Sequence, residues 1–130
     1  MAIDKRLHIL VVDDHDNMRR TILRILRLMG FTNLVSCGDG QAAWGILNDR
    51  PVELIILDWN MPVMTGMELL RQIRSSKERF HNVLVLMVTA EAKQDNVVEA
   101  MQAGATNYIV KPFNTETLER KLLDIFREKG

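Results

Sequence analysis

The chain has 130 residues, 47% of them hydrophobic, which suits one globular domain of ordinary size. Its 17 basic and 17 acidic residues give a formal net charge of zero, which argues against a general nucleic-acid binder and a polybasic membrane anchor. The single cysteine excludes an internal disulfide framework, and the sequence contains neither a signal-peptide pattern nor a stretch apolar enough to span a membrane. We therefore expect one cytoplasmic domain over residues 1–130.

The first half of the chain alternates short apolar runs with segments of helical spacing. The runs Leu7–Val12, the shorter Leu34–Cys37 and Leu54–Leu57 are typical of strands that are buried on both faces of a parallel sheet. Apolar residues at helical spacing over 18–29 predict a helix after the first run, and Gln41–Asn48 predicts another after the second.

The second half continues the same alternation. The predicted strands of this half are Val83–Val88 and Tyr108–Val110. Three helices are predicted around them, with apolar faces formed by Met67, Leu70 and Ile73, by Val97, Val98 and Met101, and by Leu118, Leu122 and Ile125. Asn114 or Thr115 is the expected cap of the last helix. Five β-α units predict an α/β fold, in which helices cover both faces of a parallel sheet. Ligands of such folds bind beyond the carboxyl ends of the strands.

Charged and hydroxyl side chains stand where four of these strands end: Asp13 and Asp14, Asp58, Thr89 and Lys111. Two carboxylates ~4 Å apart repel each other by about 4 kcal/mol at an effective dielectric constant near 20, so a cluster of three requires a proton or a bound cation. Oxygen ligands of this kind suit Mg²⁺. The set indicates a phosphoryl-transfer site with a carboxylate nucleophile. A structural cation site, or acids that only cap helices, are the alternatives.

These residues lie in motifs that resemble the receiver domain of two-component response regulators. The motifs are Val11-Val12-Asp13-Asp14, Asp58-Trp59-Asn60-Met61-Pro62, Leu86-Met87-Val88-Thr89-Ala90-Glu91-Ala92-Lys93, Ala103-Gly104-Ala105 and Tyr108-Ile109-Val110-Lys111-Pro112-Phe113. The resemblance runs from about Arg6 to Lys129 and is greatest to the chemotaxis members of the family. It implies a flavodoxin-like fold with strand order 2-1-3-4-5 and no output domain.

The resemblance also implies a role for each residue of the site. Asp58 is the expected phosphoacceptor, which takes its phosphoryl group from a histidine kinase, so the chain catalyses only its own phosphorylation and dephosphorylation and is not an enzyme in the usual sense. The expected Mg²⁺ ligands are Asp14, Asp58 and the backbone carbonyl of Asn60, with Asp13 acting through water. The remaining expected roles are contacts to the phosphoryl group from Thr89 and Lys111, a cis bond between Lys111 and Pro112, and tuning of dephosphorylation by Asn60 and Glu91.

A conformational switch is implied as well, in which Thr89 turns toward the phosphoryl group and Tyr108 moves inward. The expected output face is formed by the fourth helix, the fifth strand and the fifth helix, with Ala92, Val97, Met101, Tyr108 and Lys121 as partner-binding residues. Helical periodicity alone favours packing of Val97 and Met101 against the sheet, in competition with Val98. The implied partners are a chemotaxis histidine kinase, the flagellar motor switch and a phosphatase, with no nucleic acid and no membrane, and the protein is expected to be a monomer.

Two stretches are ambiguous in the sequence. The loop after the acid pair reads His15-Asp16-Asn17, where related chemotaxis receivers carry an aromatic residue followed by small hydroxyl residues. His15 and Asp16 are interpreted either as solvated loop residues or as groups that alter cation binding. The arginines of the first predicted helix are expected to form a solvated face, with a basic patch as the alternative. The resemblance implies that this helix lies near kinase- and phosphatase-binding surfaces, which makes Arg19 and Arg20 minor candidates for such contacts.

Other functions remain open on the sequence alone. The same chemistry would serve a phosphate sink or a phosphorelay receiver that does not bind the motor, or a receiver detached from a DNA-binding domain. A haloacid-dehalogenase phosphatase also uses an aspartyl nucleophile, but it carries a second acid at the position that Asn60 occupies here. A flavodoxin-type flavin binder would carry a Ser/Thr-rich phosphate loop after the first strand, which is absent from this sequence.

Overall fold

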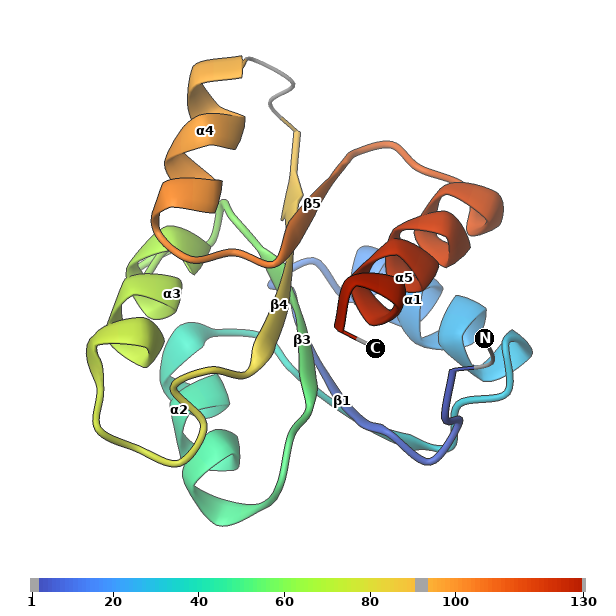
Figure 1. Cartoon of the computed structure of the whole chain (residues 1–130), viewed down its shortest axis with the longest axis horizontal. Helices are drawn as coiled ribbons and strands as arrows, with labels where there is room; N and C mark the ends of the chain where they lie inside the picture. Colours follow the sequence, from blue (N-terminus) through green and yellow to red (C-terminus); the bar gives the residue numbers. More distant parts are fainter. Residues whose placement is uncertain (1–2, 91–93, 130) are drawn as a thin grey trace.

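Five parallel strands form the centre of the protein in a computed structural model that describes residues 3–90 and 94–129 (Figure 1). The strands are β1 (His8–Val12), β2 (Asn33–Cys37), β3 (Leu54–Asp58), β4 (Leu84–Thr89) and β5 (Asn107–Val110). Their order in the sheet is β2-β1-β3-β4-β5. The predicted α/β fold and strand order are confirmed, and each predicted strand agrees with an observed one to within a residue at either end.

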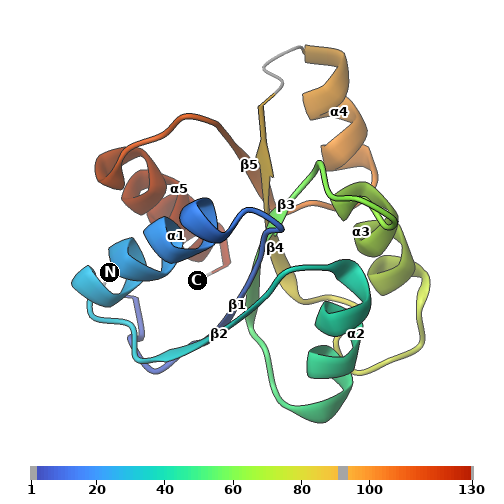
Figure 2. The same ribbon diagram turned by 180° about the vertical axis from the view of Figure 1, so that it is seen from behind.

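Helices cover both faces of this sheet. They are α1 (Asp16–Leu28), α2 (Gly40–Asp49), α3 (Gly66–Ser75), α4 (Gln94–Gln102) and α5 (Thr115–Lys129). The helices α1 and α5 lie on one side, whereas α2, α3 and α4 lie on the other, as the two opposite views show (Figures 1 and 2). Among the described residues, no helix combines the length and the apolar character that a membrane crossing requires.

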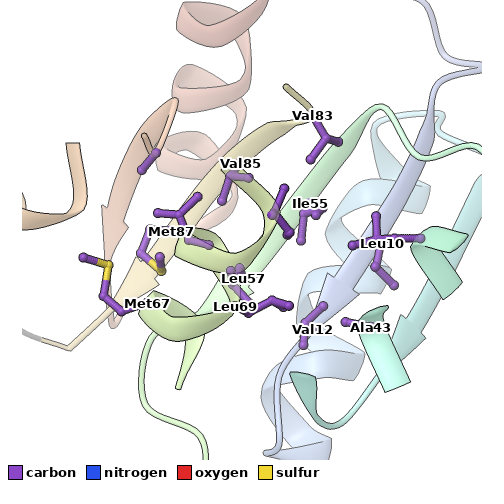
Figure 3. Packing of buried hydrophobic residues seen from close by; sticks show 14 of the residues in the cluster. Leu10, Val12, Ala43, Ile55, Leu57, Met67, Leu69, Val83, Val85 and Met87 are labelled. Carbon is purple, nitrogen blue, oxygen red and sulfur yellow. The ribbon is translucent and has the colours of Figure 1, made fainter. Parts of the chain in front are cut away.

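The central strands are buried on both faces because alternate side chains enter two separate hydrophobic clusters. Leu10 and Ile55 point toward α2 and α3 (Figure 3), whereas the neighbouring Ile9 and Ile56 belong to the cluster under α1 and α5. A shift of one residue in the register of any of these strands would move each set of its side chains to the opposite face of the sheet. The core therefore fixes the register of the sheet, and with it the relative positions of the strand ends.

Capping side chains stabilise the first turns of the helices that follow the loops at the strand ends. Asp39 accepts a hydrogen bond from the backbone N–H of Ala42 at 2.7 Å, and Thr65 forms a capping box with Glu68 at the start of α3. Of the two caps predicted for α5, Asn114 is the one used, since its Oδ1 accepts from the backbone N–H of Thr117 at 2.8 Å.

The orientation of α4 differs from the prediction made from apolar spacing. Val98 and Met101 each expose 42% of their surface, whereas Ala100 is fully buried. The helix packs inward through this small side chain, and its larger apolar residues are consequently directed toward solvent. Packing of Met101 against the sheet, which periodicity alone favoured, was therefore wrong, as was inward packing of Val98, whereas Val97 is partly exposed.

Candidate functional site

Three carboxylates meet at the carboxyl ends of β1 and β3, which are neighbours in the sheet. The register pairs Val12 with Leu57, so the next residue on each strand, Asp13 and Asp58, stands at the same edge. Asp13 is 1% exposed and Asp58 is 2% exposed. These two residues and also Asp14 and His15 each offer one possible metal-ligand atom, and the four atoms all lie within 4.8 Å of one another. The sheet topology thus gathers groups that lie 45 positions apart in the sequence (58 − 13).

Lys111 supplies the positive charge of this cluster. Its Nζ lies 3.0 Å from Oδ1 of Asp58 and 3.9 Å from Oδ2 of Asp13. The backbone N–H of Lys111 donates to the carbonyl of Thr89 at 2.8 Å, and the following bond to Pro112 is cis, as expected. Thr89 ends β4 and is 2% exposed. The end of β5 therefore brings an amine beside the acids, and Thr89 directly follows Val88, which pairs with Asp58 in the sheet.

The electrostatic balance at Asp58 is unfavourable to its ionised form. Burial raises the pKa of this carboxyl above its ordinary value, and the negative charges of Asp13 and Asp14 add to the increase. The hydrogen bond from Lys111 and its positive charge act in the opposite direction without cancelling the increase. The single ammonium group of Lys111 therefore does not offset the burial of Asp58 and the charges of its neighbours.

The unsatisfied oxygens of the site fit a hard cation. Oδ2 of Asp13, Oδ1 of Asp14 and Oδ2 of Asp58 are all buried, and none accepts a hydrogen bond within the part of the chain that the structure describes. Buried polar atoms in folded proteins are normally paired, so three such oxygens in one cluster indicate a ligand. Carboxylate oxygens are the donors that Mg²⁺ prefers, and the residues present therefore fit this ion.

Two residues that support the site were not identified as such from the sequence. A Cβ atom on Gly66 would lie 2.2 Å from the carbonyl oxygen of Asp58, so only glycine allows α3 to start this close to β3. The guanidinium of Arg19 donates to the carbonyl of Asp13 at 2.7 Å and also pairs with Asp16. The prediction of a solvated face was therefore wrong for Arg19, although Arg20 is exposed.

The other predicted site residues lie around the cluster or outside the described part of the chain. Asn60 is exposed in the loop after β3, and Trp59 is half-buried against the core. Tyr108 is half-buried on β5, where Nζ of Lys121 lies 4.4 Å above the centre of its ring. Val97 on α4 is partly exposed. The predictions for Glu91 and Ala92 concern residues outside those that the structure describes.

Known proteins are similar to this chain in sequence and in fold. The family profile of the response regulator receiver domain matches residues 9–123. The chain is 48% identical to the chemotaxis protein CheY of Pseudomonas aeruginosa over 120 residues, which cover 92% of this chain and 96% of the relative. It is 45% identical to the chemotaxis protein CheY-3 of Vibrio cholerae, with 95% of each chain covered. A high-resolution structure of the chemotaxis response regulator CheY4 of Vibrio cholerae superimposes with a TM-score of 0.85 at 32% identity, over 92% of this chain and 98% of that one.

Proposed function

The chain belongs to the receiver-domain family of response regulators, and on that premise we propose that it is a single-domain chemotaxis regulator that accepts a phosphoryl group on Asp58. The donor in this proposal is a phosphohistidine on a chemotaxis histidine kinase. The chain acts as a phosphoacceptor and catalyses only its own phosphorylation and dephosphorylation.

The observation that carries the proposal is the state of the Asp58 carboxylate. Oδ1 is paired with Lys111, whereas Oδ2 is buried and has no hydrogen-bond partner among the described residues. We assign the nucleophilic attack on phosphorus to one oxygen of this carboxylate and the contact to Mg²⁺ to the other. A bond forms between the attacking oxygen and phosphorus, the bond from phosphorus to the histidine nitrogen breaks, and that nitrogen keeps the electron pair. The product is an acyl phosphate on Asp58.

The same residues supply the charge stabilisation that phosphoryl transfer requires. We assign Asp14, Asp58 and the backbone carbonyl of Asn60 as Mg²⁺ ligands, with Asp13 acting through water. When bound, Mg²⁺ neutralises charge on the phosphoryl oxygens. Lys111 contacts one of these oxygens, and the hydroxyl of Thr89 contacts another. In the reverse process Asn60 and Glu91 flank the acyl phosphate and tune its hydrolysis by water.

Phosphorylation is proposed to act at a distance through Thr89 and Tyr108. Once Thr89 turns toward the phosphoryl group, Tyr108 moves inward and away from Lys121, which now lies over its ring at 4.4 Å. This shift changes the face formed by α4, β5 and α5, where Met101 is already 42% exposed. We propose that this face, with Val97, Ala92 and Lys121, binds the flagellar motor switch. A phosphatase is a further proposed partner, and the protein acts as a monomer.

The proposal is tested by tryptophan fluorescence with a small-molecule phosphodonor. Trp44 stacks edge-on against Phe80 with ring centres 5.2 Å apart, so Trp44→Phe keeps an aromatic contact and leaves Trp59 as the reporter beside Asp58. We expect the fluorescence of this variant to change on addition of Mg²⁺ and again on addition of acetyl phosphate. Introducing Asp58→Asn as well should abolish the second change, and a retained response would contradict the proposal.

The output is tested separately with an N-terminal peptide of a motor switch protein. Tighter binding of the peptide after phosphorylation supports the motor regulator, and Met101→Ala should weaken this binding without altering the acetyl phosphate response. Unchanged peptide binding, together with normal phosphorylation, would instead indicate a phosphate sink or relay.

A further inference from the structure

His15 is directed into the acidic cluster, although its side chain is not needed to cap the helix that follows. It is the N-cap residue of α1 and makes no side-chain capping hydrogen bond. Its imidazole Nδ1 lies 3.1 Å from Oδ1 of Asp14 and 3.4 Å from Oδ1 of Asp13. With 65% of its side chain exposed, His15 stands at the solvent edge of an otherwise buried set of ligand atoms.

These separations are those of atoms that share a metal ion. Two neighbouring ligand atoms of an octahedral ion lie about 3.0 Å apart when each bond to the metal is about 2.1 Å long. In tetrahedral coordination, the corresponding distance is about 3.4 Å. The separations of 3.1 and 3.4 Å from Nδ1 to the two carboxylates match this range.

Hydrogen bonding accounts for only part of the arrangement, since the backbone N–H of His15 donates to Oδ1 of Asp13 at 2.8 Å but its imidazole makes no hydrogen bond to Asp14. Oδ1 of Asp14 accepts no hydrogen bond from the described residues, although Nδ1 of His15 is its close neighbour. The buried Oδ2 atoms of Asp13 and Asp58 are also unpaired within the described part of the chain, and these residues are only 1% and 2% exposed. An imidazole nitrogen and several unsatisfied carboxylate oxygens therefore converge on one small volume.

Nitrogen and oxygen ligands select different ions. Mg²⁺ takes oxygen ligands and water, whereas imidazole is a good ligand for Co²⁺, Ni²⁺ and Zn²⁺. We propose that His15 is a metal ligand that gives this site a preference for first-row transition ions over Mg²⁺, beyond the preference of a site built from carboxylates alone. This inference rests on the proposed function, since it assigns the acidic cluster as the cation site.

The test compares Co²⁺ with Mg²⁺ in equilibrium titrations that do not depend on phosphorylation. Trp59 fluorescence in the Trp44→Phe background reports the binding of either ion, and the visible absorption of bound Co²⁺ reports whether a nitrogen ligand is present. The variants are His15→Ala and His15→Asn, of which the second places a preferred N-cap residue before α1 and guards against loss of the helix. His81→Ala removes an exposed histidine of the loop between α3 and β4 and is the matched control.

We expect both His15 variants to bind Co²⁺ on the order of tenfold to hundredfold more weakly and with an altered absorption spectrum. Their affinity for Mg²⁺ should stay within about twofold of that of the parent, because Mg²⁺ does not use the imidazole. His81→Ala should leave both affinities unchanged. Equal losses for the two ions, or no loss for either, would overturn the proposal, as would a gain in Mg²⁺ affinity, which would make His15 a competitor of the cation.

The same samples separate this inference from the proposed function. If the inference alone is wrong, the His15 variants bind Co²⁺ like the parent while acetyl phosphate still modifies Asp58 in the presence of Mg²⁺. If the parent protein binds neither ion, or if Asp58→Asn binds both as well as the parent does, the acidic cluster is not the cation site, and both proposals are overturned.

Discussion

Backbone strain is concentrated at one residue of the loop that follows Asp58. Val63 takes a left-handed conformation, with φ at 70°, while its side chain is fully exposed. A β-branched residue is poorly suited to this region, and such outliers cost on the order of 1–3 kcal/mol. Since the side chain is open to solvent, little packing energy offsets the cost. The strain lies three residues beyond Asn60, in the loop that the proposed site uses.

Val63→Asn should therefore stabilise the protein. Asparagine tolerates the left-handed region better than valine does, and we expect the free energy of unfolding in urea to rise by about 1 kcal/mol. Val63→Ala is the matched control, because it removes the branched side chain without the specific tolerance of asparagine, and its gain should be smaller. A Val63→Asn variant that is no more stable than the parent would show that the loop releases the strain in another way.

At the scale of helices, two glycines occupy opposite environments and form a natural pair for comparison. Gly66 opens α3 against β3, and a Cβ atom there would lie 2.2 Å from the carbonyl oxygen of Asp58. Gly45 lies inside α2, and a Cβ atom there would meet nothing within 4 Å. The same chemical change should consequently have opposite effects at the two positions.

Gly66→Ala should destabilise the protein by more than about 2 kcal/mol, because the contact is with backbone that cannot move without displacing Asp58. It should also weaken Mg²⁺ binding, since α3 can recede only by shifting the loop that carries the site. Gly45→Ala should stabilise the protein by about 0.5–1 kcal/mol through helix propensity. Urea unfolding and a Mg²⁺ titration of both variants check this, and similar effects of the two substitutions would contradict the assigned role of Gly66.

Side-chain contacts between distant elements were the part of the structure that the sequence could not predict. The strands were predictable because runs such as Leu54–Leu57 are short and apolar without interruption, which is typical of a strand buried on both faces. By contrast, Arg79 in the loop before β4 donates to the carbonyl of Leu47 at the end of α2, at 2.9 Å. Such a contact depends on how two distant segments meet in space, and no local sequence pattern predicts it.

The same distinction applies to the candidate site, where some residues could be predicted from the sequence and others could not. The three acids and Lys111 could be predicted because strand ends of a parallel sheet meet at one edge, whatever the details of packing. The role of Arg19 could not, because its spacing in α1 is that of an ordinary exposed arginine and only the fold brings it to the carbonyl of Asp13. For α4, spacing indicated the wrong inward face, since the periodicity of large apolar residues concealed the buried Ala100.

At the scale of the whole molecule, burial of the Asp58 carboxyl lowers the stability of the folded protein at neutral pH. The pKa of Asp58 is raised in the folded protein, chiefly by burial, so the folded state holds its proton to a higher pH than the unfolded state does. Below the ordinary pKa of 3.8 the group is protonated in both the folded and the unfolded state, and it does not lower the free energy of unfolding. As the pH rises above that value, the folded state must ionise a buried carboxyl, and stability falls until the raised pKa is passed.

Asp58→Asn should remove this cost in metal-free protein. We expect the variant and the parent to approach each other in unfolding free energy near pH 4 and the variant to be the more stable at neutral pH, by about 1.4 kcal/mol for each unit by which the pKa is raised. Asp49→Asn, at an exposed position in the last turn of α2, controls for the loss of one negative charge. Urea unfolding in the presence of a chelator at several pH values provides the measurement.

Addition of Mg²⁺ should reverse the order of stability. An ion that binds only the folded parent stabilises it by about 2.7 kcal/mol at a hundredfold excess over its dissociation constant, whereas Asp58→Asn lacks a proposed ligand and should gain much less. The cost of burying Asp58 would then be offset by the cation whose binding requires it. Parallel stability curves for parent and variant, at every pH and with or without Mg²⁺, would show that the ionisation of Asp58 does not influence folding.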